Sequence, residues 1–168
     1  MVLLFILIFL THDCVSFEIT VFGMAGHGKS SFVQFLCNCT IPTSSDEEMT
    51  MESQKYNISN YITLTDTPGF GTRRFPILGH FEKYRSNCGI VVLIITNRIY
   101  EQHYQFVKDV GDTNKIVIVR TQTDIFPFTN YDYIEKELGI YTIIPFHTGT
   151  EVTRDLLLQE LIMSLFLK

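Results

Sequence analysis

The stretch Gly-Met-Ala-Gly-His-Gly-Lys-Ser at residues 23–30 decides the fold of this chain. It fits the pattern G-x-x-x-x-G-K-[ST], and the short apolar run before it reads as a strand. The residues after the pattern, up to Cys37, carry apolar side chains at helical spacing. A plain glycine-rich turn is the alternative, but the succession of strand, loop and helix favours a phosphate-binding loop.

The residue types in this loop suit a phosphate group. Glycines adopt backbone angles that other residues avoid, so that successive N–H groups can point inward at an anion. Lys29 is predicted to place a positive charge on the β- and γ-phosphates of a nucleotide, and Ser30 to place a hydroxyl on Mg²⁺. The candidate phosphate contacts are Gly23, Gly26, His27, Gly28, Lys29, Ser30 and Ser31.

A second signal, Asp-Thr-Pro-Gly at residues 66–69, follows a predicted strand. In phosphate-loop enzymes an Asp at such a place holds Mg²⁺, and the Gly offers an unhindered backbone N–H to the γ-phosphate. These four residues alone would indicate an ordinary turn. Their place some forty residues after the loop instead makes Asp66 a candidate metal ligand and Gly69 a candidate phosphate contact.

A third signal, Thr-Gln-Thr-Asp at residues 121–124, ends another predicted strand. GTPases carry a base-reading [NT]-K-x-D at this place. The carboxylate of Asp124 can accept two hydrogen bonds from guanine, whereas adenine offers no such donor pair. Thr121 and Asp124 are therefore candidate base contacts. Gln122 replaces the usual lysine, whose aliphatic stem packs along the purine, so we expect weaker base binding.

Strands and helices are expected to alternate along the chain. Residues 89–95 form an apolar run without alternation, which is typical of a parallel strand covered on both faces. The pattern predicts an α/β fold with a doubly wound, mostly parallel sheet, helices on both faces, and ligands at the carboxyl ends of the strands. Strands are predicted at residues 17–22, 49–56, 58–65, 88–96, 115–120 and 141–145, and helices at 29–37, 77–85, 100–110, 131–138 and 153–166.

Length and composition favour one globular domain, which we place at residues 17–168. The 168 residues are 46% hydrophobic and include 14 Phe, which is ample for a core. A formal net charge of −5, with the 13 Lys and Arg scattered, argues against a nucleic-acid partner. The four cysteines show no metal-ligand spacing, so we expect reduced thiols in a cytoplasmic protein.

The first sixteen residues form an apolar segment of uncertain role. Its ten-residue apolar run is too short to span a bilayer as a helix. A signal peptide fits the length, but no basic residue precedes Lys29. A packed or membrane-touching segment, a fragment or misplaced start, and secretion therefore stay open, in that order of preference.

Together the motifs resemble a Ras-like G domain from Phe17 to about Leu167. A narrower resemblance is to the immunity-related GTPases, which pair D-x-P-G-x-G-T-x-x-F-P with a later V-R-T-K-x-D; residues 66–76 and 119–124 are similar to these stretches. Residues 50–52 and 81–84 also look like that family. Gln122 departs from its pattern, and its flanking helical regions have no counterpart in this sequence. The immune-associated GTPases are the nearest rival.

A GTPase site needs a cradle, a metal and an oriented water. A switch threonine from the polar loop at residues 40–48 is expected to complete the metal site and to act in catalysis. Spacing favours Thr43, with Ser44 and Thr50 as alternatives. Phe70 stands where many G domains carry a water-orienting Gln, so intrinsic hydrolysis should be slow.

Two histidines are further candidates at the nucleotide. His27 could polarise a water, although loop side chains usually point outward. His147 follows the last predicted strand, where loops of G domains touch guanine.

The sequence thus predicts an enzyme that binds GTP or GDP with Mg²⁺ and hydrolyses GTP, its nucleotide controlling association with itself or a partner. The resemblance to immunity-related GTPases implies a homodimer through the nucleotide face and membrane association. A phosphate-loop kinase is the enzyme alternative, but it would need an arginine-bearing lid. A nucleotide-stabilised scaffold that scarcely hydrolyses GTP is the other.

Overall fold

The chain folds around one six-stranded sheet. The computed structural model describes residues 17–41, 52–73, 80–84, 89–110, 115–125, 131–139, 142–147 and 153–164, and the account below concerns these residues. The strands are β1 (Phe17–Gly23), β2 (Gln54–Asn57), β3 (Ile62–Asp66), β4 (Gly89–Ile95), β5 (Ile116–Arg120) and β6 (Ile143–Pro145). The helices are α2 (Lys29–Cys37), α3 (His80–Tyr84), α4 (Glu101–Val110), α5 (Tyr131–Leu138) and α6 (Arg154–Met163).

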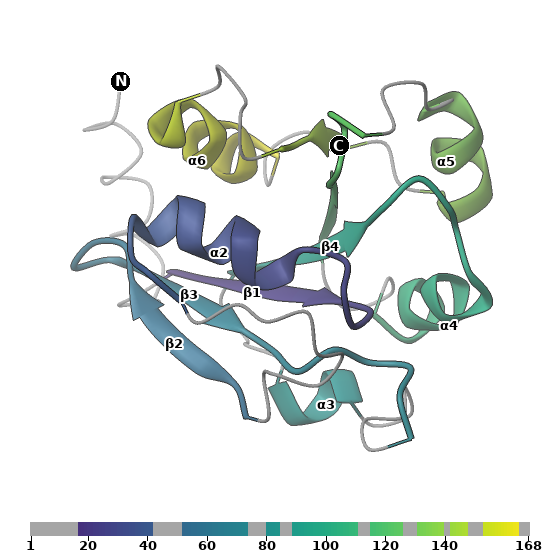
Figure 1. Cartoon of the computed structure of the whole chain (residues 1–168), viewed down its shortest axis with the longest axis horizontal. Helices are drawn as coiled ribbons and strands as arrows, with labels where there is room; N and C mark the ends of the chain where they lie inside the picture. The colour runs from purple at the N-terminus through teal and green to yellow at the C-terminus, as the bar shows by residue number, and fades with distance from the viewer. Residues whose placement is uncertain are drawn as a thin grey trace.

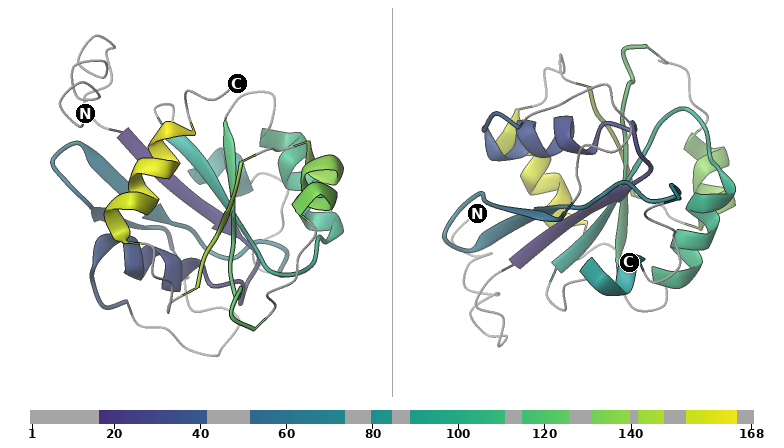
Figure 2. Two further views of the ribbon diagram at one scale, coloured as in Figure 1. Left: turned by 90° about the horizontal axis from the view of Figure 1, so that it is seen from above. Right: turned by 60° about the horizontal axis from the view of Figure 1, so that its bottom comes forward.

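The strand order in the sheet is β2-β3-β1-β4-β5-β6. Every neighbouring pair is parallel except β2 with β3, which is antiparallel. Helices α2 and α6 lie on one face of the sheet, and α4 and α5 lie on the other (Figures 1 and 2). The predicted doubly wound α/β fold is confirmed.

Apolar contacts on both faces hold the central strands. One buried cluster joins alternate residues of β1 and β4 to α2 and α6, and the other joins Phe22 of β1 and the other apolar side chains of β4 to α3, α4 and α5. In β4 every residue after Gly89 is buried, which explains why its sequence is apolar without alternation. These two clusters fix the strand ends from which the site is built.

The predicted strand at residues 58–65 begins too early. Ser59 starts a turn, because its Oγ accepts hydrogen bonds from the backbone N–H of Tyr61 at 3.2 Å and of Ile62 at 3.1 Å. Such local side-chain bonds compete with strand pairing, so β3 starts only at Ile62. The strand expected at residues 49–56 is observed as β2, and residues 49–51 lie outside the described ones.

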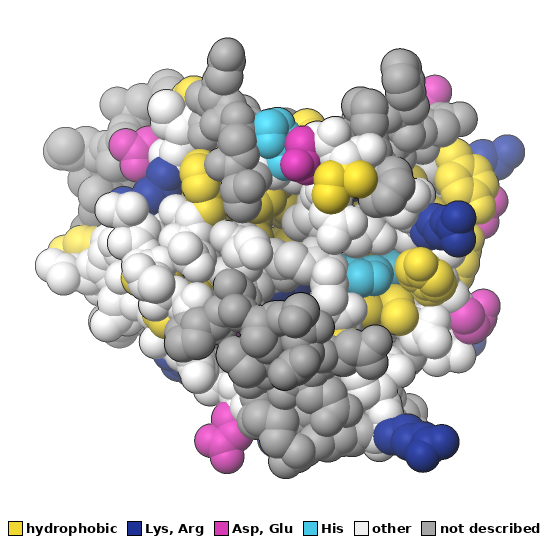
Figure 3. Space-filling view, in the orientation of Figure 1, with side chains coloured by type: hydrophobic (Ala, Val, Ile, Leu, Met, Phe, Trp, Pro, Cys, Tyr) yellow, Lys and Arg dark blue, Asp and Glu magenta, His cyan; other side chains and the backbone are white. Residues whose placement is uncertain are grey.

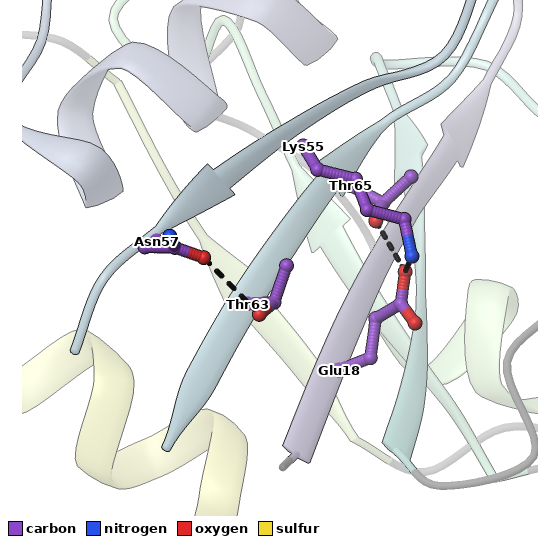
Figure 4. A network of polar contacts seen from close by, with 5 residues as sticks. All are labelled: Glu18, Lys55, Asn57, Thr63 and Thr65. Carbon is purple, nitrogen blue, oxygen red and sulfur yellow. Dashed lines mark hydrogen bonds and ion pairs between the residues drawn. The ribbon is translucent and has the colours of Figure 1, made fainter. Parts of the chain in front are cut away.

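A network of polar contacts joins strands β1, β2 and β3. Glu18 of β1 accepts a hydrogen bond from Thr65 and forms an ion pair with Lys55 at 3.2 Å, and Asn57 bonds the Thr63 hydroxyl at 3.4 Å (Figure 4). Lys55 is largely exposed, so the ion pair adds little stability. The network links β1, β2 and β3 by polar contacts on one face of the sheet, whereas the alternate residues of β1 and β3 make apolar contacts on the other face.

The expectation of reduced thiols is wrong for one pair. Cys37 and Cys39 form a disulfide at the end of α2, where the left-handed backbone of Asn38 turns the chain between them. Cys14 and Cys88 lie outside the described residues, as does the apolar segment at residues 1–16. None of the helices seen in the described ranges has the length and apolarity needed to cross a membrane.

Candidate nucleotide-binding site

The candidate site lies at the carboxyl end of β1, where the chain passes into the loop before α2. From β1 the sheet extends to β3 on one side and to β4 on the other, so this is the switch point at which open α/β sheets bind ligands. Gly26 and Gly28 have φ values of 77° and 88°, which a residue with a Cβ rarely adopts. The loop can therefore present its backbone N–H groups together with the first turn of α2.

Lys29 is held inside the loop. Its Nζ donates to the carbonyl oxygen of Met24 at 2.9 Å, and only 6% of the residue is exposed. Burial lowers the pKa of Lys29 to about 8, although the nearby carboxylate of Asp66 acts in the opposite direction. The structure thus places a poorly solvated ammonium under the phosphate-binding loop, where an anion would be strongly favoured.

Ser30 and Asp66 meet although they lie on different elements. The Ser30 hydroxyl donates to Oδ2 of Asp66 at 2.9 Å, while Oδ1 of Asp66 is buried without a hydrogen-bond partner among the described residues. Burial raises the pKa of Asp66, which Lys29 and Ser30 partly offset. A hydroxyl beside a buried carboxylate oxygen in need of a partner is a donor set that fits Mg²⁺.

The Asp-Thr-Pro-Gly segment runs against the loop. The Phe70 backbone N–H donates to the Gly23 carbonyl at 3.2 Å, and Thr67 Oγ1 donates to the Val21 carbonyl at 2.7 Å. A Cβ on Gly69 would lie 2.7 Å from the Cα and N of Ala25, so only glycine allows this approach. Gly69 is therefore brought to the loop, as its predicted phosphate contact requires.

The side chain of Phe70 points into the core. It is fully buried and stacks on Phe106 of α4, with ring centroids 5.2 Å apart and an interplanar angle of 6°. It is an apolar packing residue and offers no group to a water molecule. The position after the Gly thus serves the fold in this chain.

Thr121 connects the expected base-reading segment to the phosphate-binding loop. Its hydroxyl lies 2.7 Å from the carbonyl oxygen of His27 and 3.1 Å from that of Ile95. Its side chain also lies next to Gly28, since a Cβ at that glycine would be 3.6 Å from atoms of Thr121. The sequence suggested a nucleotide contact for Thr121, and the structure adds a positioning bond that only tertiary packing could reveal.

Asp124 and His147 lie after neighbouring strands. Gln122 has a left-handed backbone, with φ of 58°, and its carbonyl accepts the Ile125 N–H at 3.2 Å, which forms a turn that leaves Asp124 exposed. The Phe146 N–H donates to the Arg120 carbonyl at 2.8 Å, so the partly buried His147 follows directly beside the end of β5. Their roles at a base stay predictions.

The His27 side chain lies beside two rings at α4, and its role toward a water at the phosphates stays a prediction. Its ring centroid lies 5.5 Å from that of His103 and 6.0 Å from that of Tyr100. Burial, aided by Lys29, lowers the pKa of His27 to about 4, although a hydrogen bond to the Ile94 backbone opposes this. His103 was not singled out from the sequence, where nothing distinguishes it from a packed helix residue.

The remaining predicted residues are placed as follows. Ser31 follows Ser30 in the first turn of α2 and is partly buried. Thr43, with its alternatives Ser44 and Thr50, lies outside the described residues, so the switch threonine stays a prediction.

The surroundings of the site carry charges of both signs. On the face shown in Figure 3, described Lys and Arg side chains lie apart from one another, with Asp and Glu between them. Within the described loop, the groups that can attract a phosphate are Lys29 and the backbone N–H groups.

Solved structures share this fold at low sequence identity. NFeoB from S. thermophilus bound to GDP.AlF4- and K+ matches with a TM-score of 0.71 and 12% identity, covering 90% of this chain and 64% of that one. The G domain of the T. maritima FeoB iron transporter matches with a TM-score of 0.60 and 17% identity, covering 89% and 99%. Roco2 RocCORdC of Methanosarcina barkeri bound to GDP has a TM-score of 0.62 and 13% identity, covering 90% and 49%.

The chain spans less than two thirds of the length of the S. thermophilus protein, and these likenesses establish the fold. No curated protein sequence matches the chain. The sequence does match the family described as 50S ribosome-binding GTPase over residues 18–122, more than half of its length. This match covers the phosphate-binding loop, Asp66 and Gly69, and it confirms the expectation of a phosphate-loop GTPase that binds GTP and GDP. The chain is a GTPase and belongs to the family of 50S ribosome-binding GTPases.

Proposed function

We propose that GTP binds with its phosphates along residues 26–30 and its guanine at Asp124, and that it is hydrolysed to GDP and phosphate. The observation that carries this proposal is the meeting of Lys29, Ser30 and Asp66 at one strand edge, with the Ser30 hydroxyl 2.9 Å from the carboxylate. The tie between Thr121 and His27 supports it further, because it couples the base segment to the phosphate loop.

The residues of the chain divide the work of phosphoryl transfer. Lys29 and the loop N–H groups hold the β- and γ-phosphates and stabilise the charge that spreads over their oxygens. Ser30 and Asp66 would hold Mg²⁺, which supplies further charge neutralisation between the phosphates. Gly69 offers its N–H to the γ-phosphate, because its lack of a side chain lets the segment approach Ala25.

A group that orients the attacking water is expected from outside these elements. Phe70 is committed to the core, so its position contributes nothing polar. The resemblance to immunity-related GTPases implies that two G domains meet across their nucleotides. We therefore propose that a second copy of this chain supplies the group that orients the water. In other enzymes, removing one such contact to the transition state lowers the rate about 10²–10³-fold.

Turnover at increasing protein concentration tests this proposal. The rate per molecule should rise from high-nanomolar to tens-of-micromolar protein, and light scattering should show larger species with a GTP analogue but not with GDP. Lys29→Ala serves as the control that cannot bind nucleotide. A flat rate per molecule, with only monomer in the analogue, would reject self-activation and favour a monomeric switch that awaits a separate activator.

The scaffold alternative has a specific observation in its favour, namely the burial of Phe70. It requires tight GTP binding and association with no hydrolysis at any protein concentration. Single-turnover measurements on the protein with bound GTP separate it from a slow GTPase.

We further propose a cytoplasmic location, with residues 1–16 touching a membrane. The supply of GTP favours the cytoplasm, whereas the Cys37–Cys39 disulfide favours an oxidising compartment. Alkylation of thiols in intact cells followed by mass spectrometry measures the state of this pair. Flotation of the full chain and of a chain without residues 1–16 with lipid vesicles tests the membrane contact, which fails if both stay unbound.

A further inference from the structure

Two imidazole nitrogens are left without hydrogen-bond partners beneath the phosphate-binding loop. Among the described residues, Nδ1 of His27 and Nε2 of His103 are both buried and unpaired. The rings belong to the loop and to α4, and their centroids lie 5.5 Å apart. A buried polar atom without a partner is costly, so two such atoms on adjacent rings call for an explanation.

The hydrogen bonds that the rings do make assign their protons. Nδ1 of His103 accepts the backbone N–H of Tyr100 at 3.0 Å, so in a neutral ring the proton of His103 is on Nε2. A neutral His27 can accept at Nδ1 when its proton is on Nε2, and this is the tautomer that a bond from His103 requires. The unpaired Nε2 of His103 is thus a donor, and the unpaired Nδ1 of His27 is the atom on the neighbouring ring that lacks a partner.

The distance suits a direct bond between these two atoms. A hydrogen bond of about 2.9 Å between nitrogens of two imidazoles puts the ring centroids roughly 5 Å apart. The observed centroid distance of 5.5 Å, at an interplanar angle of 51°, is close to this value. In the described part of the chain no third histidine, cysteine or carboxylate joins the pair to form a metal-binding group.

We propose that His103 donates its Nε2–H to Nδ1 of His27 and thereby acts as a positioning residue for the phosphate-binding loop. The proposal rests on the GTPase function given above, because it concerns the loop that would hold the phosphates. It assigns to α4 a part in nucleotide binding.

The protonation states agree with this bond. Burial, with a smaller effect of His27, lowers the pKa of His103 to about 4, and the pKa of His27 is likewise about 4. Both rings are therefore neutral near pH 7, so each carries one donor and one acceptor. Of the described residues, Lys29 acts electrostatically on His27, and the rings of Tyr100 and Phe70 lie beside the pair.

The proposed bond from His103 matters because His27 lies between two glycines in the loop. Gly26 and Gly28 flank it, and neither has a side chain with which to fix the backbone. The carbonyl of His27 already accepts the Thr121 hydroxyl from the β5 side. A bond from His103 would hold the same residue from the α4 side, so the loop would be fixed at its centre between two conformationally free positions.

Nuclear magnetic resonance of the full chain with ¹⁵N-labelled histidine tests the bond directly. We expect both rings to carry their proton on Nε2 at pH 7, and a nitrogen–nitrogen coupling between His103 and His27. A proton on Nδ1 of His103, or no coupling between the rings, would overturn the proposal. The measurement needs no nucleotide, so it stands even where GTP binding fails.

Nucleotide affinity tests the positioning role. His103→Phe keeps a ring but removes both nitrogens, and it should weaken binding of a GTP analogue about tenfold. His103→Gln should recover part of this loss, because its amide can donate to His27. Tyr104→Phe is the matched control, since it removes a hydrogen bond of 2.8 Å to Glu137 from the next residue of the same helix.

Calorimetry and thermal melting of the three variants give a clear decision. His103→Phe that melts like the control but binds more weakly supports positioning of the loop. Equal affinity of His103→Phe and Tyr104→Phe would overturn it. If the wild-type chain itself binds no GTP while the coupling is present, the proposed function fails and the bond does not.

Discussion

Gly69→Ala is the sharpest test of how the site is assembled. The new Cβ would lie 2.7 Å from both the Cα and the N of Ala25, whereas ordinary contacts begin at 3.4 Å. Because Gly69 has no positive φ, alanine causes no backbone strain there and acts by crowding alone. One methyl group should therefore push the segment at residues 66–69 away from the phosphate-binding loop.

The size of the effect follows from this geometry. To reach 3.4 Å, the two backbones must separate by about 0.7 Å (3.4 minus 2.7). Overpacking of this kind typically costs about 1–3 kcal/mol, or roughly 5- to 150-fold in an equilibrium constant. Since Gly69 is expected at the γ-phosphate, a GTP analogue should lose more affinity than GDP.

Calorimetric titration with GDP and with a non-hydrolysable GTP analogue measures this difference. Gly139→Ala is the matched control, because it has a φ of 66° with no atom within 4 Å of its Cβ. It should lower stability by about 1 kcal/mol without changing affinity for either nucleotide. If Gly69→Ala binds the analogue as tightly as the wild type does, the close approach plays no part in γ-phosphate binding and the reasoning is refuted.

Three further changes probe the site. Lys29→Ala should abolish nucleotide binding in calorimetry. It should leave the melting temperature unchanged, because burying the Lys29 ammonium is itself unfavourable. Micromolar binding of GTP by this variant would contradict the prediction. Asp124→Asn should shift preference from guanine to xanthine nucleotides in competition assays, because an amide offers a donor, and continued preference for GTP would place base reading elsewhere. Between pH 6.5 and 4 the stability of the wild type should fall with pH more steeply than that of His103→Phe, by about 1.4 kcal/mol per pH unit, because unfolded His103 binds a proton that the folded residue, with its pKa lowered to about 4, refuses. Denaturant unfolding of wild type and His103→Phe checks this, and identical pH slopes would contradict it.

The sequence by itself determined the architecture and predicted several residues that the structure brings together at the candidate site. The loop pattern at residues 23–30, the Asp66 to Gly69 segment and the apolar run of β4 are local signals, readable from spacing and residue type over a few positions. In a parallel sheet, motifs at strand ends necessarily come together at one edge, so the meeting of Ser30 and Asp66 was also implied.

Only the tertiary structure decided how these segments are held. The hydroxyl of Thr121 bonds a loop residue 94 positions earlier, and His103 of α4 faces His27, pairings that no local pattern encodes. Phe70 looked like a defect at a catalytic position, and packing against Phe106 made it part of the core. The physical reason is that such contacts depend on which helix face meets which strand end, and that is fixed by close packing of the whole chain.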